Sequence, residues 1–519
     1  MKKICVIIYY SFFIALLSFP GKSFSQNVGI GTSSPNASAM LDVQSTSKGL
    51  LPPRMTTVQR DAISSPIPGL IIFNTDTQSL EVFTNTGWFA IKKTNFAIEK
   101  LLGGNNDEID PIIQNATDGG YILAGESKSS ANGNVTGTNH GSNEYWIMKL
   151  NAVGTIVWNK LLGGNGLEKP FSIQQTIDGG YIVAGYSGST VSGDVTGPIH
   201  GSIEFWIVKL DALGNITWNK SLGGANGDEA YNIQQTTDGG YIVAGYSASS
   251  ANGDVTATNH GLGDYWIVKL DALGNITWNK LLGGTALDVP RSIQQTTDGG
   301  YIVAGYSASS ANGDVTGTNH GMNDYWIVKL DALGNISWNK LLGGNNDERP
   351  YSIQQTTDGG YIVAGYSTSS INGDVTATNH GSNDFWIVKL DALGNITWNK
   401  LLGGSSSDFA LSIQQTTDGG YIVAGASLSS ANGDITGTTH GNYDYWIVKL
   451  DALGNISWNK LLGGSGIDAA NSIRQTSNGK YIIAGHSSSS VNGDVTGGNH
   501  GINDFWIVKL DAAGNIIQQ

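Results

Sequence analysis

Short runs of β-branched and other apolar residues, separated by turns rich in Gly, Asn and Asp, recur along most of the chain. In one such stretch, Asn232–Thr236 and Tyr241–Tyr246 flank a Thr-Asp-Gly-Gly turn of the hairpin kind. Two further strand-like runs, Ile216–Leu222 and Tyr265–Leu270, adjoin tight turns such as Asp271–Asn275. The pattern therefore predicts units of four antiparallel β-strands without a helix.

This unit repeats with a period of 60 residues, seven times in succession. The Leu-Leu-Gly-Gly segment that opens it at 101 returns at 161, 281, 341, 401 and 461, and Ser-Leu-Gly-Gly stands at 221. Repeated four-stranded units are typical of β-propellers. The sequence thus predicts an all-β fold, with a seven-bladed β-propeller over residues 95–519 and a small β-rich module over 26–94.

The polarity of the runs predicts their order from the axis to the rim. Ile233–Thr236 is polar enough to line a wet central channel, so we place this strand innermost. Ile242–Gly245 combines bulky and small residues and suits the second position, where neighbouring sheets crowd together. Trp266 and Trp278 then fill the wider gaps between blades farther out, where large aromatic area is most useful.

Eight segments compete for seven outermost strand positions. Residues 95–100 align with the outer-strand segment 215–220, whereas 514–519 is a truncated copy of the same strand without its Trp. We predict that 95–100 completes the last blade, because it runs on into Leu-Leu-Gly-Gly as every other outer strand does.

The first 25 residues have the layout of a cleavable secretory signal. Lys2 and Lys3 precede an apolar run from Ile4 to Phe19, which at 16 residues is shorter than a membrane-spanning helix. The only cysteine, Cys5, lies in that run, so the mature protein has no disulfide and no thiol chemistry. We therefore expect a protein that is secreted or held at the outer cell surface.

Composition narrows the range of partners. Only 13% of the residues are charged, and the formal net charge is -14. Such a surface repels nucleic acid and anionic membranes. The sequence therefore predicts no nucleic-acid partner and no membrane insertion.

Two resemblances to known families follow from these motifs. The Leu-Leu-Gly-Gly, Asp-Gly-Gly-Tyr-Ile-Val-Ala-Gly and Asp-Tyr-Trp-Ile-Val-Lys-Leu-Asp segments resemble the bacterial seven-bladed β-propeller repeat family, which implies secretion or surface display and brings no shared catalytic residues. The segments 28–32, 41–43, 49–57 and 69–77 resemble the N-terminal β-rich modules of phage tail fibres and bacterial surface proteins. This second resemblance implies attachment or homo-oligomer formation, and a module that merely spaces the propeller from its anchor is the alternative.

An acidic residue occupies the eighth place of every unit. The seven are Glu108, Glu168, Asp228, Asp288, Glu348, Asp408 and Asp468. Around one axis they could hold Ca²⁺, which takes several oxygen ligands. We favour the other interpretation, that each carboxylate accepts hydrogen bonds from its own loop, and expect no other cofactor.

Two loop motifs also recur in every unit. A histidine precedes Gly at His140, His200, His260, His320, His380, His440 and His500. Seven equivalent histidines are improbable catalysts, so we interpret them as residues that pin a loop. The loop Asn252–Thr256 is a weak match to a calcium loop, and turn formation by Asn, Gly and Asp explains it without an ion.

The places where near-identical units differ carry the strongest functional signal. The eleventh place reads Pro111, Phe171, Tyr231, Arg291, Tyr351, Leu411 and Asn471. Arg349 stands just upstream in its unit, and a second variable pair, such as 442–443, ends the long loop. Strand direction puts both spots on one face. Our hypothesis is that Phe171, Tyr231, Arg291, Tyr351 and Arg349 bind a partner, with neutral drift in exposed loops as the alternative.

The sequence therefore predicts a non-enzymatic extracellular or cell-surface binding or adhesion protein of a bacterium, with a protein or glycan as its partner. The second hypothesis is an extracellular hydrolase or lyase that acts on polysaccharide or peptide at the channel mouth. A lone acid–base pair on the variable face would favour the enzyme. The sequence shows none, and the one unique histidine, His486, has no acidic companion beside it.

Overall fold

The computed structural model describes residues 28–34, 39–91 and 99–517, and the chain divides into two compact units, 1–94 and 95–519. The predicted signal over 1–25 lies outside the described residues. No helix among the described residues is long and apolar enough to cross a membrane.

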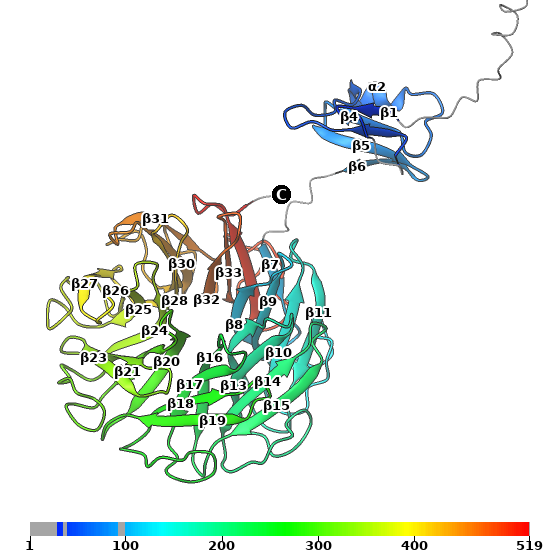
Figure 1. Cartoon of the computed structure of the whole chain (residues 1–519). Coiled ribbons are helices and arrows are strands. Elements are labelled where there is room, and N and C mark those ends of the chain that lie inside the picture. Colours follow the sequence, from blue (N-terminus) through cyan, green and yellow to red (C-terminus); the bar gives the residue numbers. More distant parts are fainter. Residues whose placement is uncertain (1–27, 35–38, 92–98, 518–519) are drawn as a thin grey trace, which may run out of the picture. The chain divides into compact units, whose positions relative to one another are not determined.

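The described residues of the first unit form two small sheets and one short helix (Figure 1). Its elements are β1 (Val28–Ile30), β2 (Leu41–Val43), β3 (Arg54–Met55), α2 (Thr57–Asp61), β4 (Ile71–Asn74), β5 (Ser79–Thr84) and β6 (Gly87–Ile91). β1 pairs with β2 in parallel, and β3 to β6 form a four-stranded sheet. A capping box of Thr56 and Gln59 starts α2, and Arg60 at its end pairs with the buried Glu81 at 2.8 Å.

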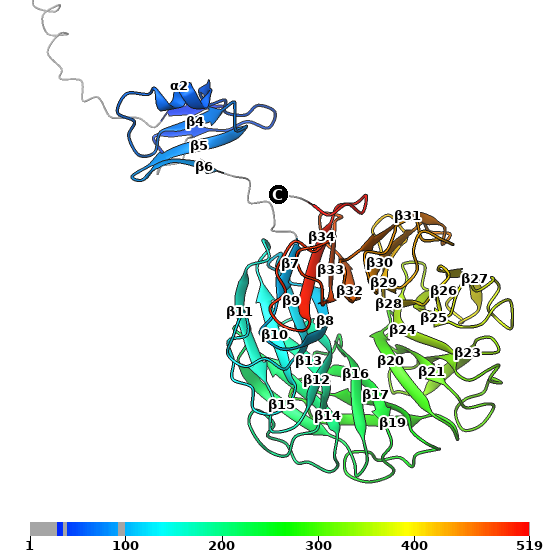
Figure 2. The ribbon, with the colours of Figure 1, turned by 180° about the vertical axis from the view of Figure 1, so that it is seen from behind.

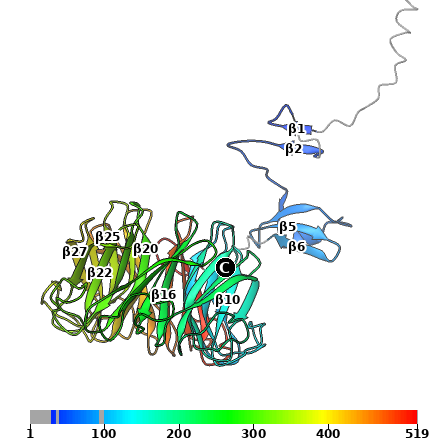
Figure 3. The same ribbon diagram turned by 60° about the horizontal axis from the view of Figure 1, so that its bottom comes forward.

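The second unit is a ring of seven four-stranded antiparallel sheets, seen face-on in Figure 1 and turned toward its side in Figure 3. The innermost strands are β8 (Glu108–Asn115), β12 (Glu168–Gln175), β16 (Asp228–Gln235), β20 (Asp288–Gln295), β24 (Glu348–Gln355), β28 (Asp408–Gln415) and β32 (Asp468–Gln475). The second strands are β9 (Tyr121–Ser127), β13 (Tyr181–Ser187), β17 (Tyr241–Ser247), β21 (Tyr301–Ser307), β25 (Tyr361–Ser367), β29 (Tyr421–Ser427) and β33 (Tyr481–Ser487).

The remaining strands complete each blade toward the rim. The third strands are β10 (Glu144–Leu150), β14 (Glu204–Leu210), β18 (Asp264–Leu270), β22 (Asp324–Leu330), β26 (Asp384–Leu390), β30 (Asp444–Leu450) and β34 (Asp504–Leu510). The outermost strands are β11 (Ile156–Leu162), β15 (Ile216–Leu222), β19 (Ile276–Leu282), β23 (Ile336–Leu342), β27 (Ile396–Leu402), β31 (Ile456–Leu462) and β7 (Glu99–Leu102). The predicted seven-bladed propeller is confirmed, and so is the order of strands from axis to rim.

The innermost strand is longer than the sequence predicts. In the third blade it begins at Asp228 rather than Asn232, so the acidic eighth place is the first residue of the strand and not part of a loop. The reason is a bulge at Tyr231, which interrupts the alternation of the ladder without ending the strand.

The core consists of seven apolar clusters, each between two adjacent blades. Tyr265 of one blade packs on Trp326 of the next, with ring centroids 4.5 Å apart, and its hydroxyl donates to the Trp326 carbonyl at 3.1 Å. Gly245 fits the predicted crowding, because a Cβ there would lie 2.3 Å from the Phe205 ring. Trp278 lies nearer the rim, half-buried against the next blade.

Two segments share the last outer position and close the ring. β7 pairs with β34, so that Leu102 lies opposite Phe505, and Figure 2 shows β7 beside the red β34. Ile516 forms a bridge with Leu510, at the point where the outer strand begins in the other blades. The predicted closure by 95–100 is confirmed for residues 99 and 100, while 95–98 lie outside the described residues. The truncated C-terminal copy of the outer strand adds one bridge, from Ile516 to Leu510, to this closure.

Candidate binding site

A β-bulge in the innermost strand of every blade sets the geometry of the site. In the third blade Ala230 pairs with Gly245 and Asn232 pairs with Ala244, so Tyr231 between them has no cross-strand partner. Bulges re-aim a side chain away from the regular alternation of a strand. The variable eleventh place of the repeat is therefore the bulged residue.

The bulged side chains converge on one pocket of about 350 Å³ at the mouth of the channel. Six of the seven eleventh-place residues line it, namely Phe171, Tyr231, Arg291, Tyr351, Leu411 and Asn471. Pro111 is not among them, because the first blade bulges over two residues, and Asp110, with a left-handed φ of 56°, lines the pocket instead. The structure thus brings together four of the five side chains predicted to bind a partner.

Arg349, the fifth predicted residue, does not line this mouth pocket. Its Nε lies 3.1 Å from Asp347 Oδ2, and its guanidinium lies over the Tyr306 ring at 4.8 Å. Being the ninth residue of its unit, it precedes the bulge and keeps the regular pairing with Tyr366. Arg349 therefore lies beside the mouth pocket, sharing the Tyr306 ring with Arg291, and its role in binding stays a prediction.

Aromatic and cationic groups form one wall of the mouth pocket. The Phe171 and Tyr231 rings meet edge-on, with centroids 5.0 Å apart. The Arg291 guanidinium lies 4.3 Å from the Tyr231 centroid and 5.6 Å from that of Tyr351. These contacts are cation–π interactions, which hold the guanidinium in place while leaving its charge unneutralised.

The two variable spots lie on one face, as the strand directions predict. Tyr443, from the second variable pair, packs on Phe409 with centroids 6.1 Å apart. Phe409 contacts Tyr366, which in turn contacts Tyr351 in the mouth pocket, at 5.3 Å and 6.2 Å. A continuous series of rings therefore joins the outer loop to the axis.

A charged cluster adjoins the mouth pocket at Asp110, and it corrects the sequence-based view of His486. Asp110 Oδ2 lies 2.6 Å from Lys169 Nζ, and its Oδ1 accepts from the Asn471 amide at 3.1 Å and lies 3.8 Å from His486 Nδ1. Burial raises the pKa of Asp110, but Lys169 and His486 outweigh burial and the net pKa is lowered. Burial lowers the pKa of His486. The unique histidine does have an acidic neighbour, contributed by the first blade across the ring closure.

Sequence reasoning also missed Arg474. The fourteenth place is Gln in the other six blades and Arg in the last, a single exception that a comparison of variable loops does not reveal. Arg474 Nε donates to Gln114 Oε1 at 3.0 Å, and Nη1 donates to the Ile473 carbonyl at 2.6 Å. It lines both the mouth pocket and the channel below it, which has a volume of about 320 Å³. Burial lowers its pKa to about 10, so it stays protonated at neutral pH.

The seven eighth-place acids serve their own blades. Asp228 accepts from the Gly224 N–H at 2.8 Å and from Ser249 Oγ at 3.0 Å. Its side chain is fully buried, and burial raises its pKa. Among the described residues, no three His, Cys, Asp or Glu side chains gather as metal ligands. The geometry agrees with the interpretation of these carboxylates as hydrogen-bond acceptors.

The repeated loop residues have the structural role that their symmetry indicates. His260 Nδ1 lies 2.6 Å from Asp264, and the His260 N–H donates to the same carboxylate at 2.9 Å. Asp254 of the Asn-Gly-Asp loop accepts from the Gly223 N–H at 3.2 Å. The first contact ties the long loop to the start of β18, and the second ties it to the residue after the end of β15.

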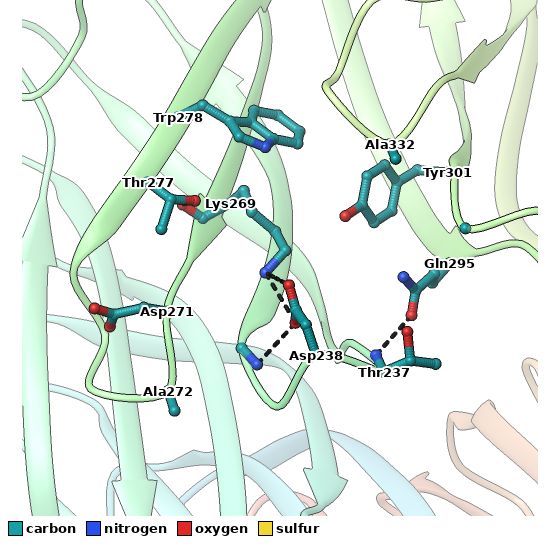
Figure 4. A pocket seen from close by; sticks show the side chains of 12 residues that line it. Thr237, Asp238, Lys269, Asp271, Ala272, Thr277, Trp278, Gln295, Tyr301 and Ala332 are labelled. Carbon is teal, nitrogen blue, oxygen red and sulfur yellow. Dashed lines mark hydrogen bonds and ion pairs between the residues drawn. The ribbon is translucent and has the colours of Figure 1, made fainter.

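A further pocket, shown in Figure 4, lies at the opposite ends of the strands, beside the tight turns. Here Lys269 Nζ lies 2.9 Å from Asp238 Oδ2, and the Thr237 N–H donates to Gln295 Oε1 at 2.9 Å. The ion pair lies within a blade and recurs in others, for example between Lys329 and Asp298. The bond from Thr237 to Gln295 joins two blades and recurs from Thr297 to Gln355. This pocket is a repeated joint between blades rather than an individual site.

One family model and two curated proteins match this chain. Residues 29–105 match the family model of the phage tail like trimerisation region, which agrees with the predicted resemblance of the N-terminal module. The regulatory protein FlaEY of Caulobacter vibrioides is 25% identical over 240 residues, 44% of this chain and 24% of that protein. An uncharacterised WD repeat-containing protein of Acanthamoeba polyphaga mimivirus is 21% identical over 472 residues, 70% of this chain and 34% of that protein. The matches thus span about a quarter to a third of these relatives.

Solved structures resemble the propeller in fold. A protein of unknown function from Dyadobacter fermentans aligns with a TM-score of 0.40 at 12% identity, over 80% of this chain and 98% of its own. BamB from Moraxella catarrhalis aligns with a TM-score of 0.37 at 13% identity, over 79% of this chain and 99% of its own. At such identities the likeness concerns the fold alone.

Proposed function

We propose that this protein is a non-enzymatic binding protein that recognises a protein or glycan partner at the mouth of its propeller. One observation carries the proposal. Six bulged side chains of five different types converge on one pocket, whereas the residues that recur in every blade are occupied with structural contacts. A site that differs at each blade around a uniform scaffold is suited to recognition of an asymmetric partner.

The N-terminal segments support a place for this binding at the outside of a bacterial cell. The pattern of residues 1–25 is that of a secretory signal, and the next segment matches a trimerisation region. A trimer would present three mouth pockets together and raise avidity without any new contact. We propose display of the propeller as a homo-oligomer, secreted or held at the cell surface.

A matched pair of fourfold variants tests the proposal. One variant changes Phe171, Tyr231, Arg291 and Tyr351 to Ser. The control changes four exposed turn residues, Leu213, Leu273, Leu333 and Leu393, to Ser; their exposed fractions are 68–70%. We expect the mouth variant to lose attachment to cells or to a glycan array, and the control to keep it. Unchanged attachment by a mouth variant with a wild-type near-ultraviolet circular dichroism spectrum would refute the proposal.

The neighbouring Asp110 and His486 favour the second candidate, a hydrolase or lyase that acts on polysaccharide or peptide at the same mouth. Their separation of 3.8 Å is too long for a hydrogen bond, and Lys169 already neutralises the carboxylate. Incubation with polysaccharides and peptides, followed by mass spectrometry, tests this candidate. Products that disappear with Asp110→Asn would establish the enzyme in place of the binding protein.

A further inference from the structure

We propose that the mouth pocket binds a saccharide that carries a carboxylate, and that Arg291 and Arg474 receive the carboxylate. This inference rests on the proposed function and names the chemical class of its ligand. It follows from the two cations in the pocket, from the neutral groups around them and from the covered edges of the surrounding strands.

Arg474 is a cation that the protein leaves without a counter-charge. Among the described residues it has no ion pair, and its hydrogen bonds go to an amide, a hydroxyl and a carbonyl through Nε and Nη1. Among the described residues, Nη2 of Arg474 has no hydrogen-bond partner. A half-buried guanidinium with an unused nitrogen is costly unless an anion completes it. Because Gln fills the same place in the other six blades, the fold itself does not require this charge.

Arg291 is a second cation without a counter-charge in the same pocket. Among the residues that the structure describes, its guanidinium has neither a hydrogen bond nor an ion pair, and its Nε is buried and unpartnered. The rings of Tyr231 and Tyr351 hold it in position. Such a planar group, fixed in advance, binds a carboxylate with little loss of side-chain entropy.

The remaining charge in the mouth pocket does not neutralise these two arginines. Among the lining residues, one carboxylate, that of Asp110, stands against the two arginines. It is paired at 2.6 Å with Lys169, which also lies 3.7 Å from Glu126; neither Lys169 nor Glu126 lines the pocket. The pocket is therefore a positive site in a chain whose net charge is -14. An anionic ligand gains a local attraction here that the rest of the surface does not offer.

The uncharged lining favours a saccharide over a peptide. The residue after the bulge is Ile112 in the first blade and small and polar in the other six, as in Asn232 and Ser292. Ser292 Oγ accepts one inter-blade hydrogen bond, from the Ile353 N–H at 3.3 Å, and its hydroxyl proton remains available to a ligand rich in hydroxyls. A peptide that binds by adding a strand needs a free strand edge. The inner edges are already covered, because the Gln235 N–H donates to Gln174 of the preceding blade, and the same link recurs from Gln295 to Gln234.

The test compares acidic saccharides with matched neutral ones. The full chain is titrated by calorimetry with a panel of uronic-acid and sialic-acid oligosaccharides, their methyl esters, and a peptide with a free carboxyl terminus. We expect at least one acidic saccharide to bind, and its ester to bind about tenfold more weakly or worse, since a charge-assisted hydrogen bond is lost. Arg474→Gln, which installs the residue of the other blades, should weaken binding similarly. Lys280→Gln, the same loss of charge on an outer strand, should leave the affinity unchanged.

The outcomes separate this inference from the proposed function. Equal affinity for acid and ester, or wild-type affinity of both Arg474→Gln and Arg291→Ser, would overturn the carboxylate site. Binding of the peptide alone would overturn the saccharide assignment. If no saccharide binds while the fourfold mouth variant still loses cell attachment, this inference fails and the proposed function stands.

Discussion

Closure of the ring by β7 gives a quantitative prediction for Leu101 and Leu102. The two side chains are 7% and 6% exposed and lie in different core clusters, Leu101 with Trp506 and Leu102 with Trp146. Truncation of a buried leucine to alanine costs about 2–5 kcal/mol. Because the two sites share no cluster, their costs should nearly add, to about 4–10 kcal/mol for the double alanine variant. That is comparable to the whole free energy of unfolding of many domains, about 5–15 kcal/mol.

The matched control is the double alanine variant of Leu161 and Leu162, which are 6% and 7% exposed in the ordinary outer strand β11. Thermal unfolding followed by near-ultraviolet circular dichroism should show similar losses for the two pairs. Ile516→Ala should lower the melting temperature less, because Ile516 is only half-buried and makes a single bridge. Likewise, deletion of 516–519 should cost far less than deletion of 95–100. A Leu101/Leu102 variant that melts like the wild type, beside a destabilised control, would refute closure by β7.

Three further predictions concern two buried carboxylates and one ion pair within a blade. Burial raises the pKa of Asp288 to about 6 from its ordinary 3.8, so the native state binds more protons than the unfolded state between these values. Stability should therefore rise as the pH falls from 7 to 5, by about 1.4 kcal/mol for this group. Unfolding in urea at several pH values measures this, and Asp288→Asn should flatten the dependence. Asp288→Glu should raise the melting temperature, because Asp288 Oδ1 has no partner whereas Glu348 at the same place accepts from Ser367 Oγ at 2.7 Å. Scanning calorimetry measures the change. The reverse substitution, Glu348→Asp, is the control and should lower the melting temperature. Hydrogen bonds from Thr236, Lys269 and Gly240 outweigh the effect of burial and lower the pKa of Asp238 to about 2. The contribution of Asp238 to the free energy of unfolding is therefore present above pH 4 and lost toward pH 2. Lys269→Met should reduce that acid sensitivity only slightly, because Asp238 is 62% exposed.

The repeat makes most of the fold predictable, because the same pattern of strand-like runs and turns recurs in each blade. Turn residues, strand-like runs and the truncated copy at the end predict four strands per blade, their order and the closing segment. The start of the innermost strand escapes prediction, because the bulge at Tyr231 breaks the alternation from which strands are recognised. The bulge is also the reason why four of the five proposed binding residues meet in one pocket and Arg349 does not.

The missed residues depend on contacts that the sequence does not place side by side. Asp110 and His486 meet only because the first and last blades become neighbours when the ring closes. Arg474 differs from six Gln residues at a place that is otherwise uniform, where its neighbours Gln114 and Ser412 come from two other blades. Pairwise distances across a closed ring are a property of the folded state, and no local pattern encodes them.

The bulge has an evolutionary consequence. A residue that stands outside the ladder can be replaced without altering any cross-strand pair, whereas its neighbours Ala230 and Asn232 remain paired. Single-codon changes at this place in successive blades can therefore alter the ligand preference while the free energy of folding stays nearly constant. A combinatorial library randomised only at the bulged positions should consist mostly of folded members, each with a different combination of side chains around the same axis.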